Sequence, residues 1–243
     1  MENLHQKSKA SQSFINAAVE FENIERILLY FKVSNYLINE DLLKSIIKLK
    51  SFNNNLEVPY ELNPEQEEDF LKINYYEKTL STMMYIKTID NFEGYFKDIL
   101  SEIVMNEPKV LKSKETEQLE FILSFDDYPS LVKAIADKKI EALFYQSIEG
   151  IQKFFKERIG IEIFKEKAGE INLLVKQRNL AVHNRSKISK EFVRQFPNEN
   201  FIEDMYLHFS FDYVEKLVPA LYKIVNELDY ELSKKYKLKQ IEY

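Results

Sequence analysis

The sequence predicts an all-α protein that folds as an antiparallel helical bundle, and three observations lead to this prediction. Apolar residues recur at helical spacing along most of the 243 residues, as expected for helices that bury one face. Glycine occurs only four times, and strand-like alternation is rare. Hydrophobic residues make up 45% of the chain and charged residues 30%, which is typical of a globular protein with a buried core.

Residues 1–63 are predicted to form an N-terminal helical extension. Its first helix is expected from Ser13 to Lys32 and a shorter one over residues 39–49, because both stretches carry apolar residues three and four positions apart. A polar stretch with two prolines follows over residues 51–64 and marks the end of the extension. Within it, alternating apolar residues over 56–62 indicate a short extended segment.

Residues 64–243 are predicted to form the bundle proper. A long helix is expected to start at Pro64, since proline and acidic residues favour a helix start, and to end at Ile103. Two helices separated by a break near residues 88–91 are the alternative. Pro219 is expected to kink the last helix. The other helices are expected over residues 119–125, 128–136, 140–156, 164–183 and 204–235. The apolar stripes of all these helices are assigned to the core.

Charge is distributed unevenly along the chain. The formal net charge is −6, yet the segment from Lys176 to Arg194 holds six cations and one anion and therefore carries +5. The other residues together carry −11. A basic segment on an acidic protein indicates one local anionic ligand, although a solvated helix end and loop would have the same composition.

Composition excludes several classes of site. The chain has no cysteine, which excludes disulfides, thiolate metal sites and a cysteine nucleophile. Its three histidines lack metal-ligand spacing and no glycine-rich phosphate loop occurs, so we expect no metal and no cofactor. Acidic pairs such as Asp126-Asp127 lie at predicted helix starts and are interpreted as caps.

The sequence also bears on the location of the protein. No apolar run reaches the ~18 residues that a membrane span needs. The first residues show no basic start followed by an apolar run, so a signal peptide is not expected. We therefore expect a cytoplasmic protein without membrane contact.

The strongest candidate site lies where the helix over residues 164–183 ends. Asn179 and His183 are four residues apart and share a helix face, and Arg178 projects beside the same edge. One helix end thus presents a guanidinium, an amide and an imidazole. A purely structural interpretation stays open, because cations at a helix C-terminus satisfy the last carbonyls and the helix dipole.

These three groups suit the cleavage of RNA. An imidazole can gain or lose a proton near neutral pH, so His183 could move a proton to or from the reacting oxygens. Arg178 could stabilise the charge that develops on the phosphate, and Asn179 could hold the phosphate or orient the histidine. Since no metal ligands accompany them, the nucleophile would be the 2′-hydroxyl of the RNA, giving a 2′,3′-cyclic phosphate and a 5′-hydroxyl. The residues predicted to bind RNA phosphates are Lys176, Arg185 and Lys187.

The number of histidines adds a requirement. One histidine cannot readily act as both base and acid across the scissile phosphate. A two-fold dimer that brings two such helix ends face to face would supply two histidines and two arginines. The hypothesis therefore requires a homodimer.

The same segment is similar to a known family. Arg178-Asn179 followed by His183 resembles the Arg-polar-x-x-x-His motif of HEPN domains. Residues 89–100 are similar to an early core helix of these domains, and residues 182–185 to the usual exit from the motif. The resemblance extends over residues 75–235 and leaves the N-terminal extension unexplained.

This resemblance implies a fold, an activity and a cellular role. HEPN domains are helical bundles that dimerise and often act as metal-independent ribonucleases in toxin–antitoxin and anti-phage systems. Arg178 and His183 would then be the catalytic pair, assisted by Asn179. A cognate antitoxin or another defence-system protein would be a partner.

Two other hypotheses stay open. A catalytically inactive HEPN module would bind a nucleotide or a partner protein, and an unrelated helical adaptor would carry the motif by chance. His208 is interpreted as structural. Tyr75, Tyr76 and Tyr145 could stack on bases, although aromatic residues at helical spacing usually belong to a core.

Overall fold

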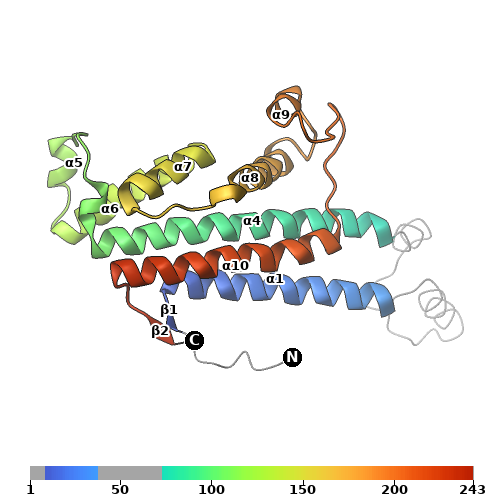
Figure 1. The fold of residues 1–243 in the computed structure, drawn as a ribbon, viewed down its shortest axis with the longest axis horizontal. Coiled ribbons are helices and arrows are strands. Elements are labelled where there is room, and N and C mark those ends of the chain that lie inside the picture. The colour runs from blue at the N-terminus through green and yellow to red at the C-terminus, as the bar shows by residue number, and fades with distance from the viewer. Residues whose placement is uncertain (1–8, 38–72, 243) are drawn as a thin grey trace, which may run out of the picture.

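Helices dominate the computed structural model, which describes residues 9–37 and 73–242 (Figure 1). The prediction of an all-α bundle is confirmed, since the only sheet in these residues has two strands of two residues. The α-helices are α1 (Gln12–Leu37), α4 (Ile73–Asn106), α5 (Leu119–Leu123), α6 (Tyr128–Phe144), α7 (Ile148–Phe154), α8 (Ala168–His183), α9 (Lys190–Gln195) and α10 (Phe211–Tyr236). The strands are β1 (Lys9–Ala10) and β2 (Ile241–Glu242), and short segments of other helix types are η1 (Pro108–Leu111), η2 (Phe155–Ile159) and η3 (Lys165–Lys167).

The three long helices lie side by side, with α1 antiparallel to the other two (Figure 1). The start of α1 meets the end of α4, where the Ser13 amide donates a 2.7 Å hydrogen bond to Glu102. In contrast, α4 and α10 run in the same direction. Their starts are joined by the Ser81 hydroxyl, which donates to the Phe209 carbonyl at 2.5 Å, and their ends by Asn106. Residues 107–210 connect the end of α4 to the start of α10, so they lead back to the end of the bundle at which α4 begins.

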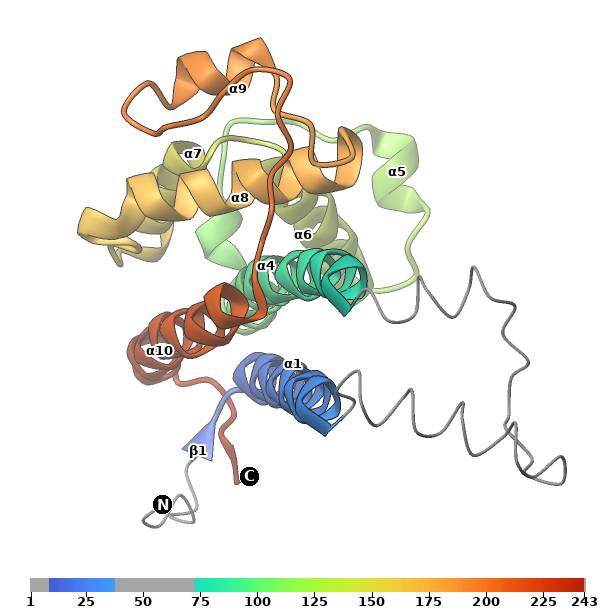
Figure 2. The same cartoon turned by 90° about the vertical axis from the view of Figure 1, so that its right-hand side faces the viewer.

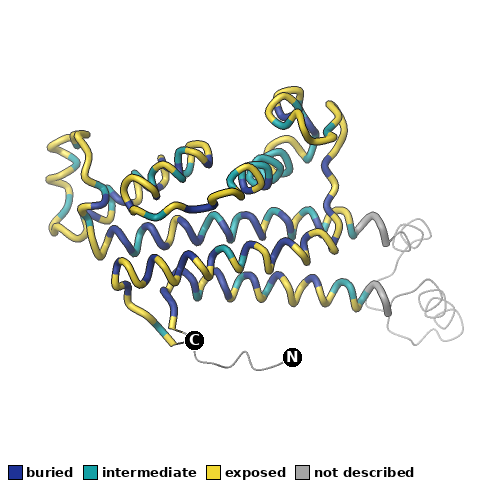
Figure 3. The backbone as a smooth tube through the Cα atoms, viewed as in Figure 1, coloured by how far each residue is buried: buried dark blue, intermediate teal, exposed yellow. Residues whose placement is uncertain are grey.

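A second layer covers the other side of α4. Figure 2 shows α6, α7 and α8 on one side of α4 and α1 and α10 on the other, with α9 outside α8. Because α4 is covered on both sides, buried residues follow it from Ser81 to Val104 (Figure 3), whereas α5 is largely exposed.

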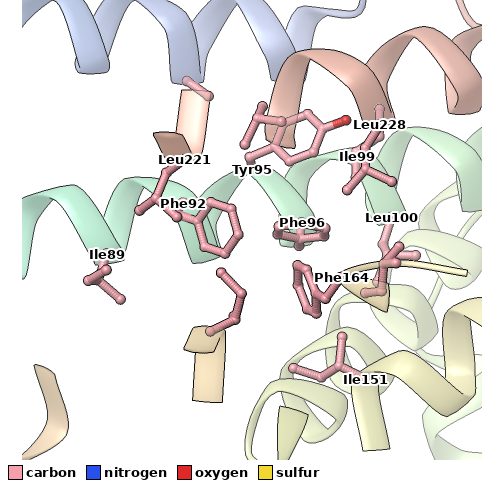
Figure 4. Close-up of a cluster of buried hydrophobic side chains, with 14 of the residues drawn as sticks. Ile89, Phe92, Tyr95, Phe96, Ile99, Leu100, Ile151, Phe164, Leu221 and Leu228 are labelled. Carbon is pink, nitrogen blue, oxygen red and sulfur yellow. The ribbon is translucent and has the colours of Figure 1, made fainter. Parts of the chain in front are cut away.

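Aromatic rings fill the space between the two layers (Figure 4). The Phe96 ring of α4 lies edge-on to Phe164 at 5.1 Å between centroids and to Phe155 at 5.8 Å. Leu221 and Leu228 of α10 close the cluster from the first layer. Burial of such large apolar side chains is the main stabilising contribution in a bundle.

A buried carboxylate joins α10 to the beginning of the described chain. Asp229 accepts hydrogen bonds from the amide and hydroxyl of Ser11 and from the hydroxyl groups of Tyr95 and Ser233. Burial raises the pKa of Asp229, and these hydrogen bonds oppose the rise. Beyond this cluster, β1 pairs with β2, so the two ends of the described chain lie together.

The first helix is built into this core. Phe14, Phe21 and Leu28 of α1 are buried among residues of α4 and α10. The domain boundary predicted between residues 63 and 64 lies outside the described residues, as do the helix predicted over 39–49 and the extended segment over 56–62.

Several predicted helix limits are wrong. Of the two alternatives for α4, the single helix is observed, since α4 continues through residues 88–91. The predicted end at Ala136 is wrong, because α6 runs unbroken to Phe144 with the polar residues 137–139 on an exposed or half-buried face. The last helix starts at Phe211 rather than near 204, since Ser210 caps it by accepting a hydrogen bond from the Tyr213 amide. The helix continues past Pro219. Helix α9 was not predicted.

Candidate functional site

A pocket of 330 Å³ contains the three residues singled out in the sequence, Arg178, Asn179 and His183. It is formed by α8, by α4, and by the end of α6 with the turn into α7. Its other lining residues are Glu93, Lys97, Glu141, Phe144, Tyr145, Gln146, Ser147, Ile148, Ile151, Asn172, Val175 and Lys176. The volume is within the range of pockets that hold small ligands.

Helix α8 presents its polar face to this pocket. Asn172, Lys176, Asn179 and His183 are spaced by three or four residues and so follow one stripe of the helix. Ile171 and Leu174 are buried on another side. The helix is thus anchored by few apolar residues, and most of its surface remains half-buried or exposed.

The last turn of α8 ends sharply after His183. The amides of Asn184 and Ser186 both donate to the Leu180 carbonyl, at 2.9 and 3.0 Å. Arg185 and Ser186 adopt left-handed backbone angles, with φ of 51° and 65°, which is a frequent way to close a helix C-terminus. His183 therefore lies at an exposed helix end.

Arg178 is held in place by two neighbours. Its Nε donates a 2.6 Å hydrogen bond to Oδ1 of Asp90, and its Nη2 lies 2.5 Å from the same oxygen. Its Nη1 donates to Oδ1 of Asn179 at 2.9 Å. The side chain keeps 25% of its surface exposed, and the guanidinium retains N–H donors for an anion because it has five in all.

Two lysines add positive charge to the pocket. Lys176 lies on the same stripe as His183 and is half-buried. The ammonium group of Lys97 on α4 lies 5.4 Å from the centroid of the Phe144 ring, a cation–π contact. The pocket therefore offers cations from both α4 and α8.

Glu93 adds an acidic group to the pocket, and Arg178 and Lys97 interact with it electrostatically. Burial raises the pKa of the Glu93 carboxyl, while Arg178 and Lys97 oppose the rise and Asp90 adds to it. The pocket is thus of mixed charge, with a carboxyl group that is easier to protonate than an exposed one.

The residues predicted to bind RNA are distributed over two regions. Lys176 lines the pocket, whereas Arg185 borders a different hollow with Ala181 and Tyr206. Lys187 pairs with Asp204 at 2.7 Å, which raises the pKa of the lysine. The sequence segment is continuous, but the turn after His183 directs its cations away from one another.

His208 and Asp127, which the sequence analysis assigns to no catalytic role, both lie outside the pocket. His208 is exposed and borders other hollows than the pocket. Asp127 caps α6 by accepting a 2.8 Å hydrogen bond from the Ser130 amide, which confirms its interpretation as a cap.

Among residues 9–37 and 73–242, no cluster of three or more histidines and carboxylates has a metal-binding arrangement. No helix in the same ranges is long and apolar enough to cross a membrane.

The pocket also contains residues that the sequence did not single out. Glu93 and Lys97, and Asp90 beside them, come from α4, about ninety positions before the motif in the chain. Residues 89–100 resemble a core helix, but no motif or spacing in the sequence assigns these side chains to a site. Only the packing of α8 on α4 brings them to Arg178.

Fold and site together define an all-helical protein with a mixed-charge pocket at the end of one helix. Comparison of the chain with protein-family models, curated proteins and solved structures finds no match.

Proposed function

We propose that this protein is a metal-independent endoribonuclease of HEPN type. The observation that carries the proposal is the gathering of Arg178, Asn179 and His183 in one pocket that also contains Lys97 and Lys176. A proton-transfer group, a fixed guanidinium and two ammonium groups in one polar pocket suit attack on a phosphodiester. The cellular role we propose is that of a cytoplasmic toxin or anti-phage effector, held in check by a cognate antitoxin or defence-system protein.

In the proposed reaction, the 2′-hydroxyl attacks the adjacent phosphorus while His183 accepts its proton. The phosphorus–5′-oxygen bond breaks, and the leaving 5′-oxygen takes a proton from a second acid. Arg178 donates N–H groups to the non-bridging oxygens, with its orientation fixed by Asp90 and Asn179. The products are a 2′,3′-cyclic phosphate and a 5′-hydroxyl. DNA lacks the nucleophile and is not cut.

The second acid is proposed to be His183 of another copy in a two-fold dimer. Large apolar side chains are exposed around the last turn of α8, as a protein interface requires. They are Met83, Val182, Met205 and Tyr206. Two-fold pairing around this turn would bring the two exposed His183 side chains toward one substrate.

Mixing wild-type protein with an excess of the His183→Ala variant tests the dimer. If both histidines serve one site, only dimers of two wild-type chains are active. At constant total protein, the activity then falls with the square of the wild-type fraction once subunits have exchanged. A fall in direct proportion to that fraction would mean that each chain acts alone.

Cleavage of total RNA and tRNA in EDTA tests the activity. Wild-type protein is expected to cut, and both Arg178→Ala and His183→Ala to lose about 10²- to 10⁴-fold in rate, the usual contribution of a positioned acid or base. His208→Ala is the matched control, because His208 is exposed but lies outside the pocket, and it should keep full activity. Cleavage that survives in both pocket variants would show that the site is elsewhere or the activity a contaminant.

One observation favours a second candidate, an inactive HEPN module that binds a nucleotide or a partner protein. Arg178 is already engaged by Asp90 and Asn179, as in an ion pair that only stabilises the fold. Absence of cleavage by the dimer on every RNA class, together with saturable binding of a nucleotide, would favour this candidate.

A further inference from the structure

Tyr145 is the most exposed of the large hydrophobic residues in the described chain, with 84% of its surface accessible. It ends α6, and its backbone amide donates to the Glu141 carbonyl at 3.2 Å. Of the two interpretations of Tyr145, a core residue or a residue that stacks on a base, its exposure argues against the first. A side chain this exposed has lost little contact with water on folding, so packing does not explain its position.

Tyr145 lines the same pocket as His183 and Arg178. Gln146, Asn172 and Lys176 line the pocket as well. An aromatic face beside amides and cations matches the parts of a nucleotide, since bases stack on aromatic rings, amides pair with base edges and cations bind phosphates.

We propose that Tyr145 is a stacking platform for an unpaired base next to the scissile phosphate, a role that rests on the ribonuclease proposed above. Bases within a duplex are already stacked on both sides and paired, so they cannot lie on this ring. The substrate is therefore single-stranded RNA or an RNA loop, and double-stranded RNA is excluded. Tyr145 sets this specificity by binding and takes no part in the proton transfers.

The absence of tryptophan from the sequence allows a direct test by fluorescence. Tyr145→Trp introduces one indole at the proposed platform, and Tyr128→Trp introduces one at an exposed position, 68% accessible, at the other end of the same helix. Each variant is titrated in EDTA with a short single-stranded 2′-O-methyl RNA, which cannot be cut by 2′-hydroxyl attack, with the same sequence as a duplex, and with a mononucleotide.

The expected result is saturable quenching of Tyr145→Trp by the single strand, little by the duplex, and none for Tyr128→Trp. Equal quenching of both variants, equal quenching by duplex and single strand, or quenching by the mononucleotide alone would each overturn the proposal. In the cleavage assay, Tyr145→Ala should raise the KM for single-stranded RNA by roughly 5- to 150-fold with kcat retained, as the loss of one stacked base implies, and Tyr145→Phe should restore it.

The two proposals fail in different ways. Cleavage by wild type without quenching of Tyr145→Trp would leave the ribonuclease intact and remove the platform. Quenching without cleavage would keep Tyr145 as a binding residue for single strands and remove the catalytic role of His183.

Discussion

Polar side chains on the two sides of α4 differ in their burial and in their hydrogen-bond partners. Toward α1 and α10, the buried Asp229 is surrounded by hydrogen-bond donors from Ser11, Tyr95 and Ser233. Toward α8, the pocket keeps Lys97, Lys176 and His183 accessible or half-buried, next to a carboxyl whose pKa is raised. Fully paired polar groups fix a fold, whereas groups left open to a ligand can bind and react.

The same contrast separates two helices. Along α10, buried apolar residues form a continuous stripe, while α8 buries only Ile171 and Leu174. Helix α10 therefore contributes mainly to the stability of the fold, whereas α8 contributes mainly its polar face to the pocket. Substitutions on the first side should change the free energy of unfolding, and those on the second should change activity.

The largest expected effect on stability is that of Phe21→Ala. Phe21 of α1 is 1% exposed, and its ring lies edge-on to Tyr222 of α10 at 6.2 Å. The substitution should lower the free energy of unfolding by about 3–5 kcal/mol, measured by chemical denaturation, and leave the activity of the folded fraction unchanged. Tyr30→Ala on the same helix is the control, because Tyr30 is exposed. Equal losses for both variants would mean that α1 is not part of the cooperative core.

A smaller effect, and one on activity, is expected for Asp90→Asn. Without its charge the residue holds the Arg178 guanidinium less firmly, so the cleavage rate should fall about 10-fold, the size expected for one hydrogen bond to a charged group. Stability should change by less than about 1 kcal/mol, since the pair is partly exposed and screened.

Combining Asp90→Asn with Arg178→Ala separates positioning from a purely structural role. If Asp90 acts through Arg178, the double variant cleaves no more slowly than Arg178→Ala alone. A further tenfold loss in the double variant would show that Asp90 acts independently.

The smallest effect is expected for Glu93→Gln, which should change how the free energy of unfolding depends on pH. Because burial raises the pKa of Glu93 above its ordinary value of 4.5, the folded state binds this proton more tightly than the unfolded state. The free energy of unfolding therefore falls as pH rises from the ordinary to the raised pKa. Glu93→Gln, which cannot ionise, should gain stability relative to wild type across this window and keep the gain at higher pH. Denaturation midpoints measured from acid to neutral pH check this, and a gain that grows toward acid pH would contradict it.

The sequence predicted much of the fold because the bundle is built from strong helical patterns. Leu217, Leu221, Leu228 and Leu232 of α10 and Phe14, Phe21, Ile24 and Leu28 of α1 are core residues, whereas Ile27 of α1 is exposed. Helix limits were less predictable where polar residues face solvent, as at 137–139 within α6. The segment from Asp204 to Leu207 pairs with residues 186–188 instead of joining α10, a long-range contact that local periodicity does not contain.

The site was predictable only where one helix carries it. Arg178, Asn179 and His183 share α8, so their spacing alone placed them together. Asp90, Glu93 and Lys97 belong to α4, and Tyr145 to the end of α6, so their meeting depends on tertiary packing. The basic segment does not present its cations on one surface, because Lys176 lines the pocket whereas Lys187 pairs with Asp204.

The chemistry at His183 is tested most directly by the ends of the RNA products. A single-stranded RNA is incubated with wild-type protein in EDTA, and the fragments are analysed by mass spectrometry, with His183→Ala as the control. The expected fragments carry 2′,3′-cyclic phosphates or their hydrolysed forms and 5′-hydroxyls, and they are missing with the variant. Fragments with 5′-phosphates and 3′-hydroxyls, or identical fragments from the variant, would contradict 2′-hydroxyl attack assisted by His183.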